Sequence, residues 1–337
     1  MMDADGDRGQ GGELVIVPAD GDDGAAAVSF LYSESRERAR GYADEATAAN
    51  TRRAYRADWR DFSAWCERNH RGALPALPET VAVYLAAQAG HRKTSTIGRR
   101  LSAIAQAHKT AGLDSPTGEA AVRQVLAGIR RRHGTRQVGK EAAVTADVRA
   151  MVGTLEPSLA GRRDRALLLL GFAGAFRRSE LVALDAADVQ RTRDGLVVTV
   201  RRGKTDQEGA GREVGIPYGS TPATCPVRAV ADWTELSGIA DGPLFRPIDR
   251  HGTLRPRRLT DQSVALVIKR AATAAGLDPR IYAGHSLRSG LATAAAQAGV
   301  SERAIMEQTG HKSLPVVRRY IRRGSLFSDN AAARVGL

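Results

Sequence analysis

The chain has 337 residues, of which 42% are hydrophobic and 26% charged, and its formal net charge is +13. This length is enough for about two domains with a sizeable core, which excludes a minimal peptide module. No apolar run approaches the roughly 18 residues of a membrane span, and no secretory signal begins the chain. Two distant cysteines, Cys66 and Cys225, make neither a disulfide framework nor a CxxC zinc site, which favours a cytoplasmic protein.

The charge is divided unevenly along the chain. Residues 1–46 hold 11 acidic and 4 basic side chains, which leaves 46 basic and 26 acidic side chains, a net charge of +20, for residues 47–337. The first segment is rich in Gly, Asp and Ala and has little periodicity, so we expect a mostly disordered acidic leader. The basic remainder favours a polyanionic partner, and we expect this partner to be nucleic acid. The alternative is that the charge serves solubility alone.

The first predicted domain, residues 47–133, is all helical. Apolar residues recur at helical spacing over 51–69, behind an N-cap residue at Asn50. An arc of about 100° beside that apolar face is strongly basic. Such a stripe fits a helix that faces DNA, although an ordinary solvated face gives the same pattern. The stripe consists of Arg52, Arg53, Arg56 and Arg60.

Three more helices complete this domain, at residues 81–89, 94–111 and 118–132. Arg99 and Arg100 lie early in the helix 94–111, and we expect this helix to be a candidate for reading the major groove. A glycine-containing linker is predicted at residues 134–143.

In the second predicted domain, residues 144–337, the spacing of apolar residues changes once from a helical to a strand-like period. Its helical segments are separated by a β-rich stretch in which Asp194-Gly195 marks a hairpin. The fold class that we expect is therefore mainly α, with a mixed, mostly helical second domain that holds one small antiparallel sheet. The predicted elements are a helix from Thr145 that stops before Pro157, apolar and helical segments at 166–176 and 179–184, strands at 196–200 and 213–216, and helices from Thr260 almost to the end.

Four short segments of the second domain carry polar side chains of catalytic type. Each is weak alone. The GKT triplet lacks the first glycine of a phosphate-binding P-loop, the H-x-x-R spacing occurs also at His133, and a tyrosine beside isoleucine and valine is usually a core residue. The segments are FRRSEL with Arg177 and Glu180, RRGKTD with Lys204, GHSLRSG with His285 and Arg288, and GHKSLPVVRRYIR with His311 and Tyr320.

Together, these side chains are the types that metal-free phosphoryl transfer to a tyrosine requires. Attack on a phosphodiester builds up negative charge, which arginine forks stabilise well. A phenol with a pKa of about 10 needs a base or a cationic field to become a nucleophile at neutral pH. The leaving oxygen needs a proton, which a lysine or a histidine can supply.

The order and spacing of these residues resemble the signature of the tyrosine recombinases, or phage integrases, and the likeness to Cre-type members extends over roughly residues 47–337. The resemblance implies a SAM-like helical core-binding domain and a catalytic domain of the DNA breaking-rejoining fold. It implies that Tyr320 attacks the scissile phosphate and forms a 3′-phosphotyrosine, without ATP, metal ion or other cofactor. It assigns the non-bridging oxygens to Arg177 and Arg288 with help from His311, proton transfer to His285, protonation of the 5′-oxygen to Lys204, and the orientation of Arg177 to Glu180.

The resemblance also implies partners. We expect double-stranded DNA with inverted-repeat core sites, a homotetramer on two such sites, and association with the nucleoid. Residues 326–337 are a candidate for docking on a neighbouring protomer, and a frayed end is the alternative. The helix from Thr260, preceded by Arg257 and Arg258, is a further candidate for base readout, although most arginines contact phosphates.

Three other functions remain open at this point. A type IB topoisomerase would use the same chemistry as a monomer, without paired sites. A DNA-binding regulator would keep the scaffold without catalysis, which the presence of all six catalytic positions disfavours. A metal-dependent nuclease or transposase would lose its activity with a chelator.

Overall fold

The computed structural model describes residues 32–39, 41–42, 48–135, 139–203 and 210–324, with the backbone alone at 49, 316 and 321–324. The chain folds into two compact units, Met1–Gln137 and Val138–Leu337. Residues 32–39 and 41–42 are helical and exposed, which the expectation of a mostly disordered leader did not include. The rest of that leader up to residue 47, residues 136–138 of the predicted linker and the predicted docking segment 326–337 lie outside the described residues.

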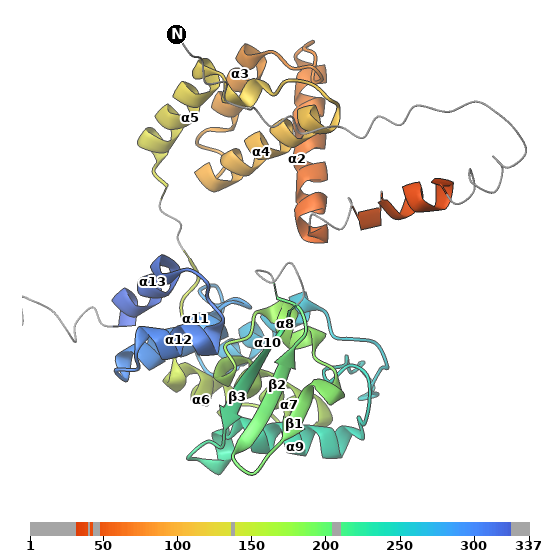
Figure 1. The fold of residues 1–337 in the computed structure, drawn as a ribbon. Helices are drawn as coiled ribbons and strands as arrows, with labels where there is room; N and C mark the ends of the chain where they lie inside the picture. Colours follow the sequence, from red (N-terminus) through yellow and green to blue (C-terminus); the bar gives the residue numbers. More distant parts are fainter. Residues whose placement is uncertain (1–31, 40, 43–47, 136–138, 204–209, 325–337) are drawn as a thin grey trace, which may run out of the picture. The chain divides into compact units, whose positions relative to one another are not determined.

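The first unit contains a four-helix core, as its apolar periodicity predicts (Figure 1). The ring of Phe62 is fully buried and lies edge-on to that of Tyr84, with 4.9 Å between the centroids. The first of these helices starts after Ala48 rather than at the predicted cap Asn50, whose side chain accepts a hydrogen bond from Arg53 instead. The helices are α2 (Ala49–Arg68), α3 (Pro78–Gln88), α4 (Thr94–Thr110) and α5 (Ala120–His133).

The second unit combines helices with one three-stranded antiparallel sheet in the order β1-β2-β3. Between strands β2 and β3, Leu196 pairs with Ile216 and Val200 pairs with Arg212. The predicted strands at 196–200 and 213–216 are confirmed. Strand β1 precedes the predicted Asp194-Gly195 hairpin, although its bounds were not predicted, and α9 was not predicted. The elements are α6 (Thr145–Gly153), α7 (Leu159–Ala173), α8 (Arg178–Ala183), β1 (Val189–Arg191), β2 (Gly195–Val200), β3 (Arg212–Pro217), α9 (Pro226–Ser237), α10 (Asp261–Ala274), α11 (Ser286–Gln297), α12 (Glu302–Thr309) and α13 (Leu314–Gly324).

One hydrophobic core joins the sheet to the helices behind it. Leu196, Val198 and Val200 alternate towards this core along β2, while α7 and α9 supply its other side (Figure 1). A smaller cluster around Ile305 and Val317 holds α11, α12 and α13 together. This arrangement confirms the predicted fold class: mainly helical, with one small antiparallel sheet in the second unit.

Candidate active site

The first catalytic candidate, Arg177, is held at the start of α8. It occupies the N-cap position, and its backbone N–H donates to Oε2 of Glu180 at 3.1 Å. Its Nη1 donates to Oε1 of the same carboxylate, whose side chain is only 2% exposed. Glu180 therefore fixes both the backbone and the guanidinium of Arg177, which fits the orienting role that the family resemblance implied.

Arg288 lies in the first turn of α11 and is fully buried. Its Nη1 donates to the carbonyl oxygen of Ala175 at 2.8 Å, while Nε and Nη2 have no hydrogen-bond partner among the described residues. Burial, and then the neighbouring charge of Arg177, lowers the pKa of Arg288 to about 10. Ala175 has a φ of 47°, a left-handed conformation that non-glycine residues rarely adopt, and this turn aims its carbonyl at the guanidinium.

His285 and Tyr320 meet although they are 35 residues apart. The Tyr320 hydroxyl lies 2.8 Å from Nε2 of His285, which is the residue just before α11. The tyrosine ring is half-buried on α13 and packs against the small cluster that contains Ile305 and Val317. The hydroxyl therefore faces the other catalytic candidates, as the hypothesis of a tyrosine nucleophile requires.

His311 follows α12, with its ring centroid 5.8 Å from that of Tyr320. Its Nδ1 lies 2.6 Å from the hydroxyl of Thr309, which donates its own hydrogen to the carbonyl of Ile305 at 2.6 Å. The hydroxyl consequently accepts from Nδ1–H, which leaves Nε2 of the neutral ring with a lone pair. Burial, followed by the charges of Arg288, Arg177, His285 and Arg212, lowers the pKa of His311 to about 3.

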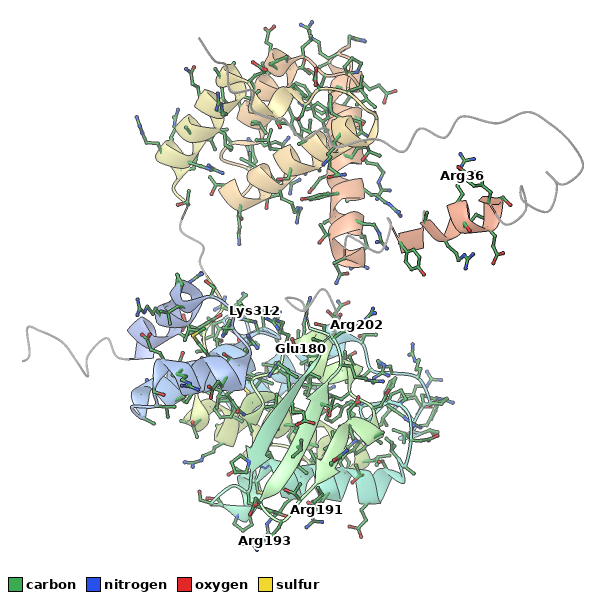
Figure 2. The ribbon with its side chains drawn as sticks, viewed as in Figure 1. Arg36, Glu180, Arg191, Arg193, Arg202 and Lys312 are labelled. Carbon is green, nitrogen blue, oxygen red and sulfur yellow. The ribbon has the colours of Figure 1, made fainter. Side chains whose placement is uncertain are left out.

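A cavity of about 680 Å³ opens beside these groups, and Arg177, Gly203, Arg212 and His311 are among its lining residues. Lys204, the predicted general acid, lies outside the described residues, directly after Gly203. Figure 2 shows Glu180, Arg202 and Lys312 at one end of the second unit, whereas Arg191 and Arg193 lie at the opposite end. Five of the six predicted catalytic residues lie close together, with Glu180 beside them.

One arginine of this site was not predicted from the sequence. Arg212 begins β3, lines the cavity and donates from Nη2 to Oε2 of Glu180 at 3.4 Å. A signal for it existed, because Arg212, Val214 and Ile216 stand at every second position and so share the inward face of the strand. An arginine in phase with two buried apolar residues indicates a buried ion pair.

The basic stripe of the first unit lies along α2 as predicted. Its four arginines line a groove together with Trp59. Their contact with DNA stays a prediction, as does that of Arg99, whose half-exposed guanidinium is held by the buried carboxylate of Asp58 at 2.7 Å and 3.0 Å.

Arg100 requires a correction. Its side chain is only 8% exposed, and it donates to Asp61, Tyr84 and Gln88 inside the first unit. These contacts connect α4 to α2 and α3, so Arg100 stabilises the helix packing instead of reading a groove. Neighbouring arginines on one helix thus have opposite environments.

Arg258 is anchored within the second unit, but 37% of its side chain is exposed, so its contact with DNA stays a prediction. Its Nη1 donates to the carbonyls of Val182 and Leu184, and its Nη2 pairs with Asp185 at 2.5 Å. The side chain therefore stabilises the C-terminal end of α8. Arg257 is exposed, and its DNA contact stays a prediction.

The described residues also bear on membrane and metal binding. None of the helices in this part of the chain combines the length and the apolar character needed to cross a membrane. His, Cys, Asp and Glu side chains of the same residues form no group of three or more that could hold a metal ion. Whether the reaction is independent of metal ions stays a prediction.

Comparisons with known proteins agree on one class. The model of the phage integrase family matches residues 144–325. The integrase/recombinase XerD homolog of Selenomonas ruminantium is 43% identical over 296 residues, which cover 87% of both chains. The recombinase Cre of Escherichia phage P1 is 30% identical over 293 residues, which cover 81% of this chain and 83% of Cre.

Solved structures show the same fold. A lambda integrase tetramer bound to a Holliday junction superposes with a TM-score of 0.57 at 17% identity, over 86% of this chain and 76% of that one. XerH bound to palindromic difH substrate superposes with a TM-score of 0.55 at 18% identity, over 76% of this chain and 72% of that one. The family match and the curated relatives define an enzyme that breaks and rejoins DNA strands. The chain belongs to the phage integrase family, and it is a tyrosine site-specific recombinase.

Proposed function

We propose that the chain recombines duplex DNA through a covalent 3′-phosphotyrosine on Tyr320, without a metal ion or ATP. One observation carries this proposal: the Tyr320 hydroxyl lies 2.8 Å from Nε2 of His285, one helical turn before the buried guanidinium of Arg288. A nucleophile within hydrogen-bond reach of a base, with a cation beside the reacting centre, is the arrangement that attack on a phosphodiester requires.

In the proposed reaction, the Tyr320 oxygen forms a bond to phosphorus while the bond from phosphorus to the 5′-oxygen breaks. Nε2 of His285 takes the phenolic proton. Lys204 gives a proton to the leaving 5′-oxygen, a role that rests on the family resemblance and on the position of Gly203 at the cavity. The covalent link keeps the phosphodiester free energy, so the reverse attack by a different 5′-hydroxyl completes the exchange without a further energy source.

Arg177 and Arg288 neutralise the charge that develops on the non-bridging oxygens. Nε and Nη2 of Arg288, which have no hydrogen-bond partner in the part of the chain that the structure describes, form the side-on fork of a guanidinium, and this fork matches two oxygens of one phosphoryl group. Glu180 holds Arg177 before DNA arrives, so the reorganisation needed during the reaction is small.

His311 assists once it has gained a proton. In the free protein its Nε2 carries a lone pair and cannot donate to a phosphate oxygen. An entering phosphodiester places a negative charge among the cations that lower the pKa of His311, and this charge raises that pKa. Binding of the scissile phosphate is therefore coupled to proton uptake at Nε2.

The proposed substrate is duplex DNA with inverted-repeat core sites, bound by four protomers on two sites. The basic stripe on α2 and the net charge of +20 over residues 47–337 support a polyanionic ligand. Two structural relatives support the assembly by analogy, since one is a lambda integrase tetramer on a Holliday junction and the other is XerH on a palindromic substrate.

The decisive experiment is covalent capture. A random-sequence library of nicked duplexes is incubated with the full chain and a chelator, and DNA that survives denaturing washes is amplified. We expect a covalent adduct for the native chain and none for Tyr320→Phe. No adduct from the native chain, or an undiminished adduct from the variant, would overturn the proposal.

A further inference from the structure

Arg212 connects two parts of the active site that come from distant stretches of the chain. Its Nη2 donates to Oε2 of Glu180 on α8, and its Nη1 donates to the backbone carbonyl of Gln308 at the end of α12, both at 3.4 Å. The guanidinium carbon lies 6.0 Å from the ring centroid of Phe176. The side chain is 24% exposed, so these contacts are only partly open to water.

Glu180 is the point at which two arginines meet. Its Oε1 accepts from Nη1 of Arg177, while its Oε2 accepts from the Arg177 backbone and from Arg212. Without Arg212, one oxygen of this buried carboxylate would keep only a backbone partner. A buried charge that loses a partner moves or takes up a proton, and either change would release Arg177.

The turn that precedes His311 is shaped around the same guanidinium. Gly310 has a φ of +63°, in the left-handed region that favours glycine, and a Cβ at this position would lie 2.8 Å from Nε of Arg212 and 3.1 Å from its Cζ. Glycine thus permits both the backbone conformation and the close approach. The backbone that leads into His311 therefore lies directly against Arg212.

The charge of the cluster depends on Arg212 as well. The three arginines 177, 212 and 288 and the carboxylate of Glu180 together leave two net positive charges around a neutral His311. The transition state of phosphodiester cleavage carries close to two negative charges, against one in the ground state. Loss of Arg212 would leave one net positive charge to meet them.

We propose that Arg212 is a positioning residue of this recombinase, which holds Arg177 through Glu180 and the backbone of His311 through Gly310, so that both side chains face one phosphoryl group. The role rests on the proposed function and requires no contact between Arg212 and DNA.

The test measures single-turnover adduct formation by the full chain on nicked duplexes recovered in the covalent capture. We expect Arg212→Met to slow adduct formation by about 10²-fold, with DNA affinity changed by less than about threefold. Arg212→Lys should recover part of the rate, because it keeps the charge but not the fork. Arg191→Met is the matched control on the same sheet, at the end far from the site (Figure 2), and should react at the native rate. A native rate for Arg212→Met would overturn the proposal.

A double-mutant cycle separates positioning from general loss of structure. If Arg212 acts through Glu180, the variant that combines Arg212→Met with Glu180→Gln should react no more slowly than the slower single variant. Two independent effects that multiply would overturn the proposed route.

A second readout does not depend on catalysis. Arg212 is one of four cationic or ionisable neighbours that lower the pKa of His311, with Arg288, Arg177 and His285. NMR titration of the histidines should show a higher pKa for His311 in Arg212→Met than in the native chain, and an unchanged value would overturn the positioning role. Absence of an adduct from the native chain would instead overturn the proposed function, so the two failures are distinguishable.

Discussion

Arg288 is a buried cation with too few hydrogen-bond acceptors in the DNA-free protein. Its removal should therefore stabilise the fold while abolishing the reaction. The substitution is Arg288→Met, which keeps most of the unbranched stem and removes the charge. In the native chain only Nη1 has an acceptor, and Nε and Nη2 have none among the described residues. The folded protein is thus expected to hold this charge at a cost that DNA relieves.

The size of this cost follows from the pKa. Burial lowers the pKa of Arg288 to about 10 in the folded protein, well below that of a free guanidinium, and at 1.36 kcal/mol per pKa unit this difference corresponds to about 3 kcal/mol. Because the folded pKa of this base is the lower one, the cost is fully present at neutral pH and is relieved only as the pH rises through about 10. Subtracting about 1 kcal/mol for the lost hydrogen bond to Ala175 leaves a net gain of about 2 kcal/mol.

The assay is thermal unfolding at pH 7, where a gain of about 2 kcal/mol should raise Tm by roughly 4 to 8 °C for a unit of this size. Arg163→Met is the matched control, because Arg163 is also buried but fully paired: Nε and Nη2 donate to Asp164 at 2.9 Å and 2.7 Å, and Nη1 donates to the carbonyl of Arg246. Removing it leaves the buried Asp164 with Arg270, whose Nη2 donates to Oδ2 at 2.7 Å, and should cost about 1 to 3 kcal/mol. Shifts of the same sign in both variants, or a lower Tm for Arg288→Met, would refute the reasoning.

Three more outcomes are expected. DNA affinity should fall by about 10³-fold or more between roughly 50 and 200 mM salt if about six phosphates are contacted; filter binding checks this, and a flat response contradicts a charged clamp. The pKa of His311 is about 3 in the folded protein and about 6.5 in the unfolded chain, so between these pH values the unfolded chain binds the extra proton. Stability should therefore fall as the pH decreases from about 6.5 to 3, and it should fall less in His311→Gln. Thermal unfolding at several pH values measures this difference. Gly290→Ala would place a Cβ 1.9 Å from the carbonyl oxygen of Ala143 and should lower stability by about 1 to 3 kcal/mol, which denaturant unfolding measures.

The helices and the sheet were predictable where one local signal dominates. Thr260 caps α10 as expected, with its hydroxyl accepting from the backbone of Ser263. The Asp194-Gly195 signal marked the β1-β2 hairpin, where Gly195 adopts a φ of 155° that is open to glycine. Helix α9 was not predicted although Val227, Val230 and Trp233 recur on one face, because the preceding segment is rich in turn residues that obscure its start at Pro226.

Charge alone did not predict whether an arginine side chain faces solvent or the interior of its unit. Arg99 and Arg100 are neighbours on α4, yet the first remains half exposed and the second is buried by partners on two other helices. Those partners, Asp61 and Gln88, lie 39 and 12 residues away in sequence, so only the tertiary fold reveals them. Residue type predicted better which side chains gather at the candidate active site, because six chemically matched positions in one order rarely arise together.

The two arginines that we propose bind the scissile phosphate, Arg177 and Arg288, are held in different ways, and the difference has a physical reason. Glu180 pairs with Arg177, so this guanidinium is fixed and partly neutralised before DNA binds. Arg288 has no carboxylate partner among the described residues, and a carbonyl on the strained turn at Ala175 orients it without cancelling its charge. An arginine that is neutralised by a carboxylate gives a weaker positive potential at the phosphate. An arginine without such a partner gives a stronger potential but destabilises the folded protein in the absence of DNA. Because each arrangement compensates for the weakness of the other, the site keeps one rigid anchor and one uncompensated charge for the phosphoryl group that we propose both arginines bind.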